Sequence, residues 1–191
     1  LIGAGCDETM PMPFLAPGDL ENAGLSSTAI SISNPLVQEE SLLRTSLMPG
    51  QLKIISYNQS HRIKKLKFFE IGHVYLPSED NQLLPDEREY LSISIAGGDA
   101  TEIVAILDMI SLTMAFPNMQ LKQQEIEGLH PGRSAQVFVA GQERGAVGEV
   151  DPRVLRNYGI DDSVAWLELD LGSILAGPFG KKKYTSVSKY P

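Results

Sequence analysis

Two carboxylates and a histidine in the second half of the chain are of the types that acid–base catalysis requires. Glu149 and Asp151 stand two positions apart at the end of an apolar run, and His130 precedes them. Alternation along a strand would place both carboxyl groups on one face, where they could serve as general acid and general base. Alternatively, acidic residues end a strand in solvent where Pro152 begins a turn. The sequence favours the solvated strand end, and an active ligase or hydrolase using these three residues stays the alternative.

Several other chemical sites have no counterpart in the sequence. Neither His73 nor His130 has a second histidine at metal-ligand spacing, so each is predicted to have a structural hydrogen-bonding role. The Gly-x-Ser-x-Gly pattern of serine hydrolases and the phosphate-binding Gly-x-x-x-x-Gly-Lys-Ser/Thr pattern are absent. Cys6 is the single cysteine, which excludes an intrachain disulfide, and it is interpreted as a small buried side chain.

The composition is that of a folded, acidic protein. Its 191 residues are 42% hydrophobic and 21% charged, which excludes a disordered tail, and no apolar run is long enough for a membrane span. Sixteen basic against 24 acidic residues give a net charge of −8. Domains that bind nucleic acid on their own are usually basic, so little affinity for nucleic acid is expected. The run Lys181–Lys183 is interpreted as a solvated linker in preference to an RNA contact.

Hydrophobic periodicity predicts several strands interrupted by a few helices. Helix is predicted from Gln38 in two pieces separated by Pro49-Gly50, from Asp99 to Pro117, and from Pro152 to Tyr158. Strands are predicted at 66–76, around 91–95 with Ser92 and Ser94 on a wet face, at 136–140 and 146–150 as a hairpin, and at 164–171. Residues 10–19 and 77–89 are predicted to be loops. Together these elements predict an α+β domain with an antiparallel sheet and flanking helices.

Two segments are less generic than the rest. His130-Pro131-Gly132-Arg133-Ser134-Ala135 is followed by the hairpin glycines at 145–152. The first part of this pattern predicts a turn in which Gly132 has positive φ and Arg133 binds backbone carbonyls or a carboxylate. The hairpin glycines are predicted to permit close backbone packing. The second segment is Asn34-Pro35-Leu36 followed by residues 40–50, which include Leu-Arg-Thr-Ser-Leu-Met-Pro-Gly.

With Phe69-Glu70-Ile71-Gly72-His73-Val74-Tyr75, these segments resemble the β subunit of bacterial phenylalanyl-tRNA synthetase. Five motifs, at 34–36, 43–50, 69–75, 130–135 and 145–152, follow the family's order, and Asp151 stands where the family usually has His. The resemblance implies structural roles, and no catalytic, cofactor-binding or metal-binding role, for the signature residues Leu43, Arg44, Thr45, Pro49, Gly50, Glu70, Gly72, His130, Pro131, Gly132, Arg133, Gly148, Glu149 and Pro152.

The resemblance also implies where the chain belongs. Residues 1–183 would be the non-catalytic, class II synthetase-like core module, and 184–191 the linker into an anticodon-binding domain of a longer cytoplasmic protein. Partners would be the catalytic α subunit in an α2β2 assembly and, through it, tRNA(Phe), with ATP and Mg²⁺ used by the full complex and no cofactor bound by this chain. In agreement, neither 67–70 nor 172–180 contains the arginine that would hold the triphosphate. An unrelated soluble binding domain is the other alternative.

Overall fold

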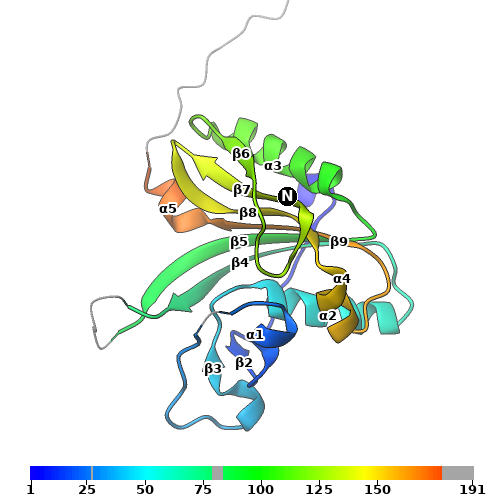
Figure 1. Ribbon diagram of the computed structural model, residues 1–191, viewed down its shortest axis with the longest axis vertical. Coiled ribbons are helices and arrows are strands. Elements are labelled where there is room, and N and C mark those ends of the chain that lie inside the picture. Colours follow the sequence, from blue (N-terminus) through cyan, green and yellow to red (C-terminus); the bar gives the residue numbers. More distant parts are fainter. Residues whose placement is uncertain (27, 79–83, 178–191) are drawn as a thin grey trace, which may run out of the picture.

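The computed structural model describes residues 1–26, 28–78 and 84–177. Its centre is a seven-stranded sheet in the order β1-β4-β5-β9-β8-β7-β6 (Figure 1). All neighbouring strands are antiparallel except β1 and β4. In chain order, the strands are β1 (Asp7–Glu8), β4 (Leu66–Leu76), β5 (Asp86–Ala96), β6 (Gln120–Gln123), β7 (Leu129–Val139), β8 (Gln142–Val150) and β9 (Val164–Asp170).

One face of the sheet is covered by α3 (Ala100–Met114), α5 (Leu171–Leu175) and the short helix η1 (Ile2–Ala4). The apolar positions of α3 recur at helical spacing and pack on alternate residues of the central strands. This core includes Cys6, which is 2% exposed as expected, and the buried residues Ile93, Ile103, Leu107, Leu167 and Leu169.

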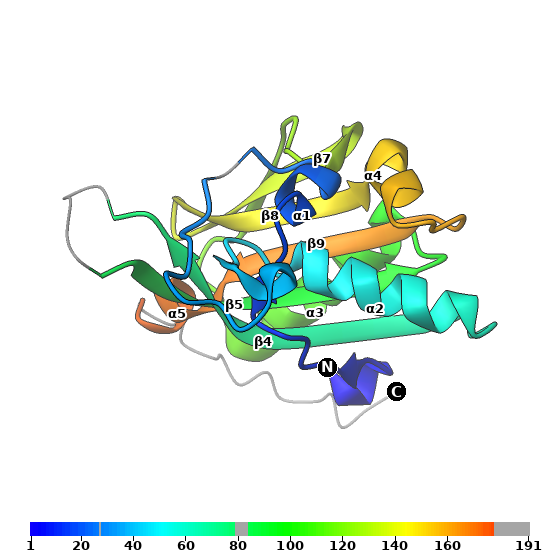
Figure 2. The same ribbon diagram turned by 90° about the horizontal axis from the view of Figure 1, so that it is seen from below.

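The opposite face carries α2 (Met48–Ser60) and α4 (Pro152–Asn157) (Figure 2). Their buried apolar side chains belong to the same hydrophobic cluster as Trp166. The segment before α2 forms α1 (Asp19–Asn22), η2 (Gln38–Glu40) and a two-stranded sheet of β2 (Phe14–Leu15) and β3 (Leu42–Leu43). Both faces of the central strands are therefore buried. Among the described residues, no helix is long and apolar enough to cross a membrane.

Most predicted elements are confirmed. Strand 66–76 has the predicted bounds, and Asp99 accepts a hydrogen bond from the Glu102 amide at the start of α3. The predicted hairpin of β7 and β8 is confirmed, but its turn is shorter than the segment left between the predicted strands 136–140 and 146–150. The chain turns at Ala140 and Gly141, both with positive φ, as a two-residue turn of this hand requires, and β8 already begins at Gln142. Gly159, also at positive φ, follows α4.

The Pro49-Gly50 pair does not separate two helices. Both residues lie in the first turn of α2, where an amide hydrogen has no intrahelical acceptor and proline costs nothing. The predicted first piece is only the turn η2, followed by β3. The predicted wet face of Ser92 and Ser94 is also wrong. Each side chain is 0% exposed, because α2 covers that face of the sheet. β5 begins at Asp86, inside the segment predicted as a loop to 89. The segment 10–19, also predicted as a loop, contains the short strand β2 and the first residue of α1.

Gly132 does not occupy a turn with positive φ. It lies within β7, and a Cβ there would only touch the His130 ring at 3.7 Å. A glycine is required instead at Gly128, which precedes β7. Its φ is +75, and a Cβ there would stand 2.7 Å from the Ala23 carbonyl oxygen. The predicted close packing is confirmed at Gly148, where a Cβ would collide with the Arg133 carbonyl.

Candidate functional site

A row of polar side chains crosses the α2 side of the sheet. Glu70 on β4 is in register with Ser92 on β5, and Ser92 with Glu168 on β9. Cross-strand partners point to the same face, so these three side chains form a line beneath α2. The row continues to Ala146 and Gln136 on β8 and β7.

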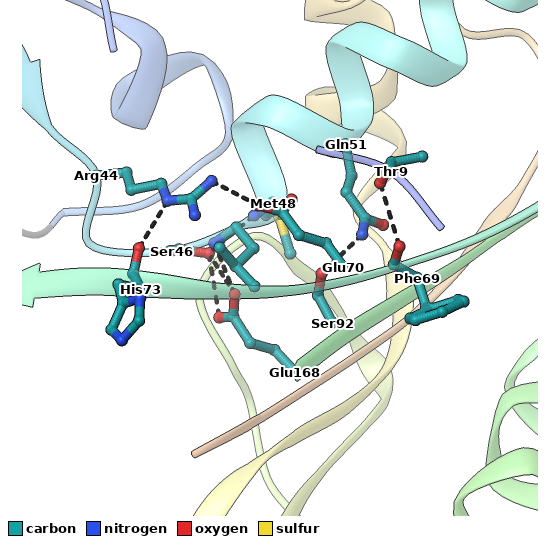
Figure 3. A network of polar contacts seen from close by, with 11 residues as sticks. Thr9, Arg44, Ser46, Met48, Gln51, Phe69, Glu70, His73, Ser92 and Glu168 are labelled. Atoms are coloured by element: carbon teal, nitrogen blue, oxygen red, sulfur yellow. Dashed lines mark hydrogen bonds and ion pairs between the residues drawn. The ribbon is translucent and has the colours of Figure 1, made fainter. Parts of the chain in front are cut away.

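Arg44 is held over Glu70. Its Nη1 lies 2.6 Å from Glu70 Oε1, and its Nε donates to the His73 carbonyl at 2.7 Å (Figure 3). Both charged residues are buried, at 7% and 2% exposed. Gly72 leaves the room for this pair, because a Cβ there would collide with the guanidinium. Burial raises the pKa of the Glu70 carboxyl, and the Arg44 guanidinium opposes that rise.

Glu168 connects β9 to the start of α2. Its Oε1 accepts from the Leu47 amide at 2.7 Å, and the Ser46 hydroxyl lies 3.1 Å from each carboxylate oxygen. Burial raises the pKa of Glu168 to about 7, while the Leu47 amide acts in the opposite direction. The carboxylate therefore serves as a structural cap of the segment that leads into α2.

Gln51 completes the network from α2. Its Nε2 donates to the Ser92 hydroxyl at 2.7 Å, and the side chain is 0% exposed (Figure 3). Gln51 Oε1 and Glu70 Oε2 are buried without a hydrogen-bond partner in the described part of the chain. The row is thus largely occupied by contacts within the chain.

Beside this row, a pocket of about 420 Å³ opens between the sheet, the start of α2 and residues 124–127. Trp166, Ala146 and Leu129 contribute apolar surface, and the acidic lining residues are Glu125, Glu127, Glu143 and Glu168. Among the described residues that line it there is no lysine or arginine. Phosphate groups need fixed positive charge, so these residues do not fit the triphosphate of ATP.

The described residues contain no group of three or more His, Cys, Asp and Glu side chains placed to hold a metal. Mg²⁺ in enzymes is commonly held by carboxylates together with substrate phosphates. The acidic pocket provides no cationic partner for such phosphates.

The three residues of the acid–base alternative are engaged elsewhere. Glu149 is 7% exposed, pairs with Arg133 at 2.9 Å and accepts from the Ala100 amide. Asp151, also 7% exposed, caps α4 by accepting from the Arg153 amide at 2.7 Å. The solvated strand end is therefore wrong for both, because arginines compensate their burial. The Arg153 guanidinium lowers the pKa of Asp151.

The remaining predicted residues lie in two parts of the fold, one around β7, β8 and the start of α4, the other from β3 to the start of α2. His130 Nδ1 accepts from the Gly132 amide at 3.1 Å, and Arg133 reaches the Glu149 carboxylate as expected. Pro152 opens α4. Leu43, Thr45, Pro49 and Gly50 lie in or between β3 and the first turn of α2.

Sequence reasoning missed Ser46, Gln51, Ser92 and Glu168 as members of the network. A signal existed for Glu168, since it alternates with Val164 and Trp166, whose apolar side chains indicate that this face of β9 is buried too. For Gln51, the only signal was a polar residue next to Leu52 in the helix.

Comparison with known proteins gives a consistent result over the whole chain. The family model described as phenylalanyl tRNA synthetase beta chain CLM domain matches residues 1–171. The phenylalanine–tRNA ligase beta subunit of Clostridium tetani is 31% identical over 100% of this chain and 25% of its own length. That of Aeropyrum pernix is 34% identical over 90% of this chain and 31% of its own length. The chain spans about a quarter to a third of these two relatives.

A similar fold occurs in a solved pyrrolysyl-tRNA synthetase. The structure of the pyrrolysyl tRNA synthetase PylSc from Desulfitobacterium hafniense superposes with a TM-score of 0.73 at 15% identity, covering 91% of this chain and 61% of that one. At this identity the likeness concerns the fold. It confirms the expected α+β architecture with a class II synthetase-like sheet.

Proposed function

The chain belongs to the phenylalanyl-tRNA synthetase β-chain family, and we propose that it is a non-catalytic structural module of that subunit. One observation carries this proposal: the pocket beside the polar row is lined by four glutamates and by no lysine or arginine among the described residues. A site that activates an amino acid with ATP must stabilise developing negative charge on phosphate. Carboxylates in that position act against it.

The internal contacts of the row support the same proposal. Arg44, which lies over the polar row, pairs with Glu70 and donates a hydrogen bond to the His73 carbonyl. Glu168 caps the entry to α2, and Gln51 binds Ser92. Groups that hold the domain together in this way are not free to bind a substrate.

The proposed setting follows from the family. The module supports assembly with a catalytic α subunit, in an α2β2 enzyme that charges tRNA(Phe) with phenylalanine in the cytoplasm, using ATP and Mg²⁺ at the α subunit. Residues 1–183 are proposed as the core module. The linker proposed at 184–191, and the run Lys181–Lys183, lie outside the described residues.

Exchange of labelled pyrophosphate into ATP tests the proposal directly. With phenylalanine and Mg²⁺, this chain should give background exchange, and an assembled α/β enzyme provides the positive control. In the assembled enzyme, Glu168→Gln should leave the exchange kcat within about twofold. Exchange by this chain that disappears on Glu70→Gln would overturn the proposal.

A further inference from the structure

The net charge of −8 hides a long basic stretch. Residues 41–69 contain no aspartate or glutamate and six of the chain's 16 lysines and arginines. They are Arg44, Lys53, Arg62, Lys64, Lys65 and Lys67. Sequence reasoning considered only Lys181–Lys183 as a basic run, because the overall acidic balance dominates the composition.

Three of these six cations are neutralised in the fold. Arg44 pairs with Glu70, Lys53 with Asp19, and Lys67 with Glu102. Arg62, Lys64 and Lys65 have no salt bridge in the described part of the chain, and all three are exposed. They lie in the connection between α2 and β4, at a corner of the molecule (Figure 2). We call these three residues, with Tyr57 and His61, the basic corner.

An exposed aromatic pair adjoins the three cations. Tyr57 is 66% exposed, and its ring centroid lies 4.3 Å from that of His61, one helical turn later. Tyrosine is an apolar ring with a polar tip, and a surface ring next to unpaired cations is the combination that RNA-binding surfaces use. On such surfaces the cations contact phosphates, and the ring stacks on a base.

The backbone of the basic corner is held in place. The Arg62 amide donates to the Gln59 carbonyl at 2.9 Å and the Ile63 amide to the Asn58 carbonyl at 3.1 Å, which is a Schellman end of α2. Arg62 occupies its left-handed position with φ 66, where glycine is usual. An arginine there costs conformational energy that glycine would not.

Acidic groups border the corner without pairing with it. Asp162 accepts from Gln59 on α2, and Asp161 is its exposed neighbour in the loop before β9. Glu102 is bound by Lys67. The local balance is therefore positive on the α2–β4 connection, while the pocket on the same side of the sheet is acidic.

We propose that the basic corner binds the RNA backbone of a tRNA, with Arg62, Lys64 and Lys65 on phosphates and Tyr57 stacked on an exposed base. The proposal rests on the proposed function, which supplies a tRNA as the polyanion. It adds a direct RNA contact by this module, at a surface separate from the acidic pocket. The net charge of −8 still predicts little affinity for tRNA by this chain alone, so the contact is proposed for the assembled enzyme.

The test uses the assembled α/β enzyme and measures the Kd for tRNA across salt concentrations. Changing Arg62, Lys64 and Lys65 together to glutamine should reduce the slope of log K against log salt by about 2 to 3. Tyr57→Ala should weaken binding by about 5- to 150-fold without changing the slope. Arg62→Gly should weaken tRNA binding while thermal stability stays equal or rises, which separates RNA contact from folding.

A triple variant of equal charge change controls for net charge. Lys122, Arg144 and Arg156 form no salt bridge in the described part of the chain, although Lys122 lies over the Phe138 ring and Arg144 donates to Gln142. Their change to glutamine should leave the salt slope near that of the unchanged enzyme. Equal slopes in all three enzymes, or an equal fall in both triple variants, would overturn the proposal. Loss of the α subunit from the basic-corner variant would also overturn it and assign the surface to a protein partner. Failure of the proposed function would give a different result from failure of the RNA-binding proposal, because the unchanged β chain would then not copurify with an α subunit.

Discussion

Replacing Arg44 with methionine should destabilise the domain strongly. The change removes the guanidinium that lies 2.6 Å from Glu70 Oε1 and 2.7 Å from the His73 carbonyl. Glu70 is 2% exposed and its Oε2 already has no partner in the described part of the chain. Removing one partner of a buried ion pair costs about 3–5 kcal/mol, because the remaining carboxylate stays buried without compensation.

The pH dependence of that loss identifies its cause. Burial already raises the pKa of Glu70 above its usual value, and Arg44 opposes the rise. Without Arg44 the folded-state pKa rises further above the unfolded value, so the folded state binds the additional proton. A carboxyl of this kind loses stability as pH increases. The deficit of Arg44→Met should therefore be largest near pH 8 and shrink toward pH 5.

Urea unfolding of this chain at pH 5 and pH 8, followed by circular dichroism, measures both quantities. Adding Glu70→Gln to Arg44→Met should recover part of the loss at pH 8, since no charge stays buried. Lys67→Met is the matched control, because its partner Glu102 is 40% exposed and such surface pairs contribute about 0–1 kcal/mol. A deficit for Arg44→Met below that of Lys67→Met, or one independent of pH, would refute the reasoning.

Further predictions concern the same side of the sheet. Because burial raises the pKa of Glu168 from 4.5 to about 7, the domain should lose stability as pH rises from 5 to 8. Glu168→Gln should reduce that loss of stability, which is at most about 3 kcal/mol for this group. Urea unfolding at several pH values measures the loss, and a pH profile unchanged by the substitution would contradict the prediction. Gly128→Ala should lower the midpoint of thermal unfolding, because φ is +75 and the Ala23 carbonyl blocks a Cβ, whereas Gly132→Ala should leave the midpoint nearly unchanged. Equal effects of the two alanines would contradict the assignment of strain to Gly128.

Local sequence patterns were sufficient for much of the fold. The aromatic and β-branched run at 66–76, the Asp99 cap and the hairpin of β7 with β8 are determined by residues near one another in the chain. The ordered motifs from Asn34 to Pro152 were also enough to indicate the family. These features depend on propensity, capping and turn chemistry, which act over a few residues.

Burial was where sequence reasoning failed. Alternation of Ser92 and Ser94 with apolar residues suggested a wet face, yet α2 covers it. Glu149 and Asp151 looked like a solvated strand end, yet each is buried against an arginine. A second layer that packs on a sheet comes from distant parts of the chain, so the period of the strand alone does not reveal it.

The sequence by itself indicated the five long strands, the main helices and the family, because each depends on local patterns or on ordered motifs. It did not indicate the short strands β1, β2, β3 and β6. Only the tertiary structure decided which polar residues meet. Arg44 and Glu70 are 26 residues apart, and Ser46 and Glu168 are 122 apart. Their contacts arise because β4, β5 and β9 lie side by side beneath α2. Sheet order and register set those contacts, and both depend on long-range pairing that no local pattern specifies.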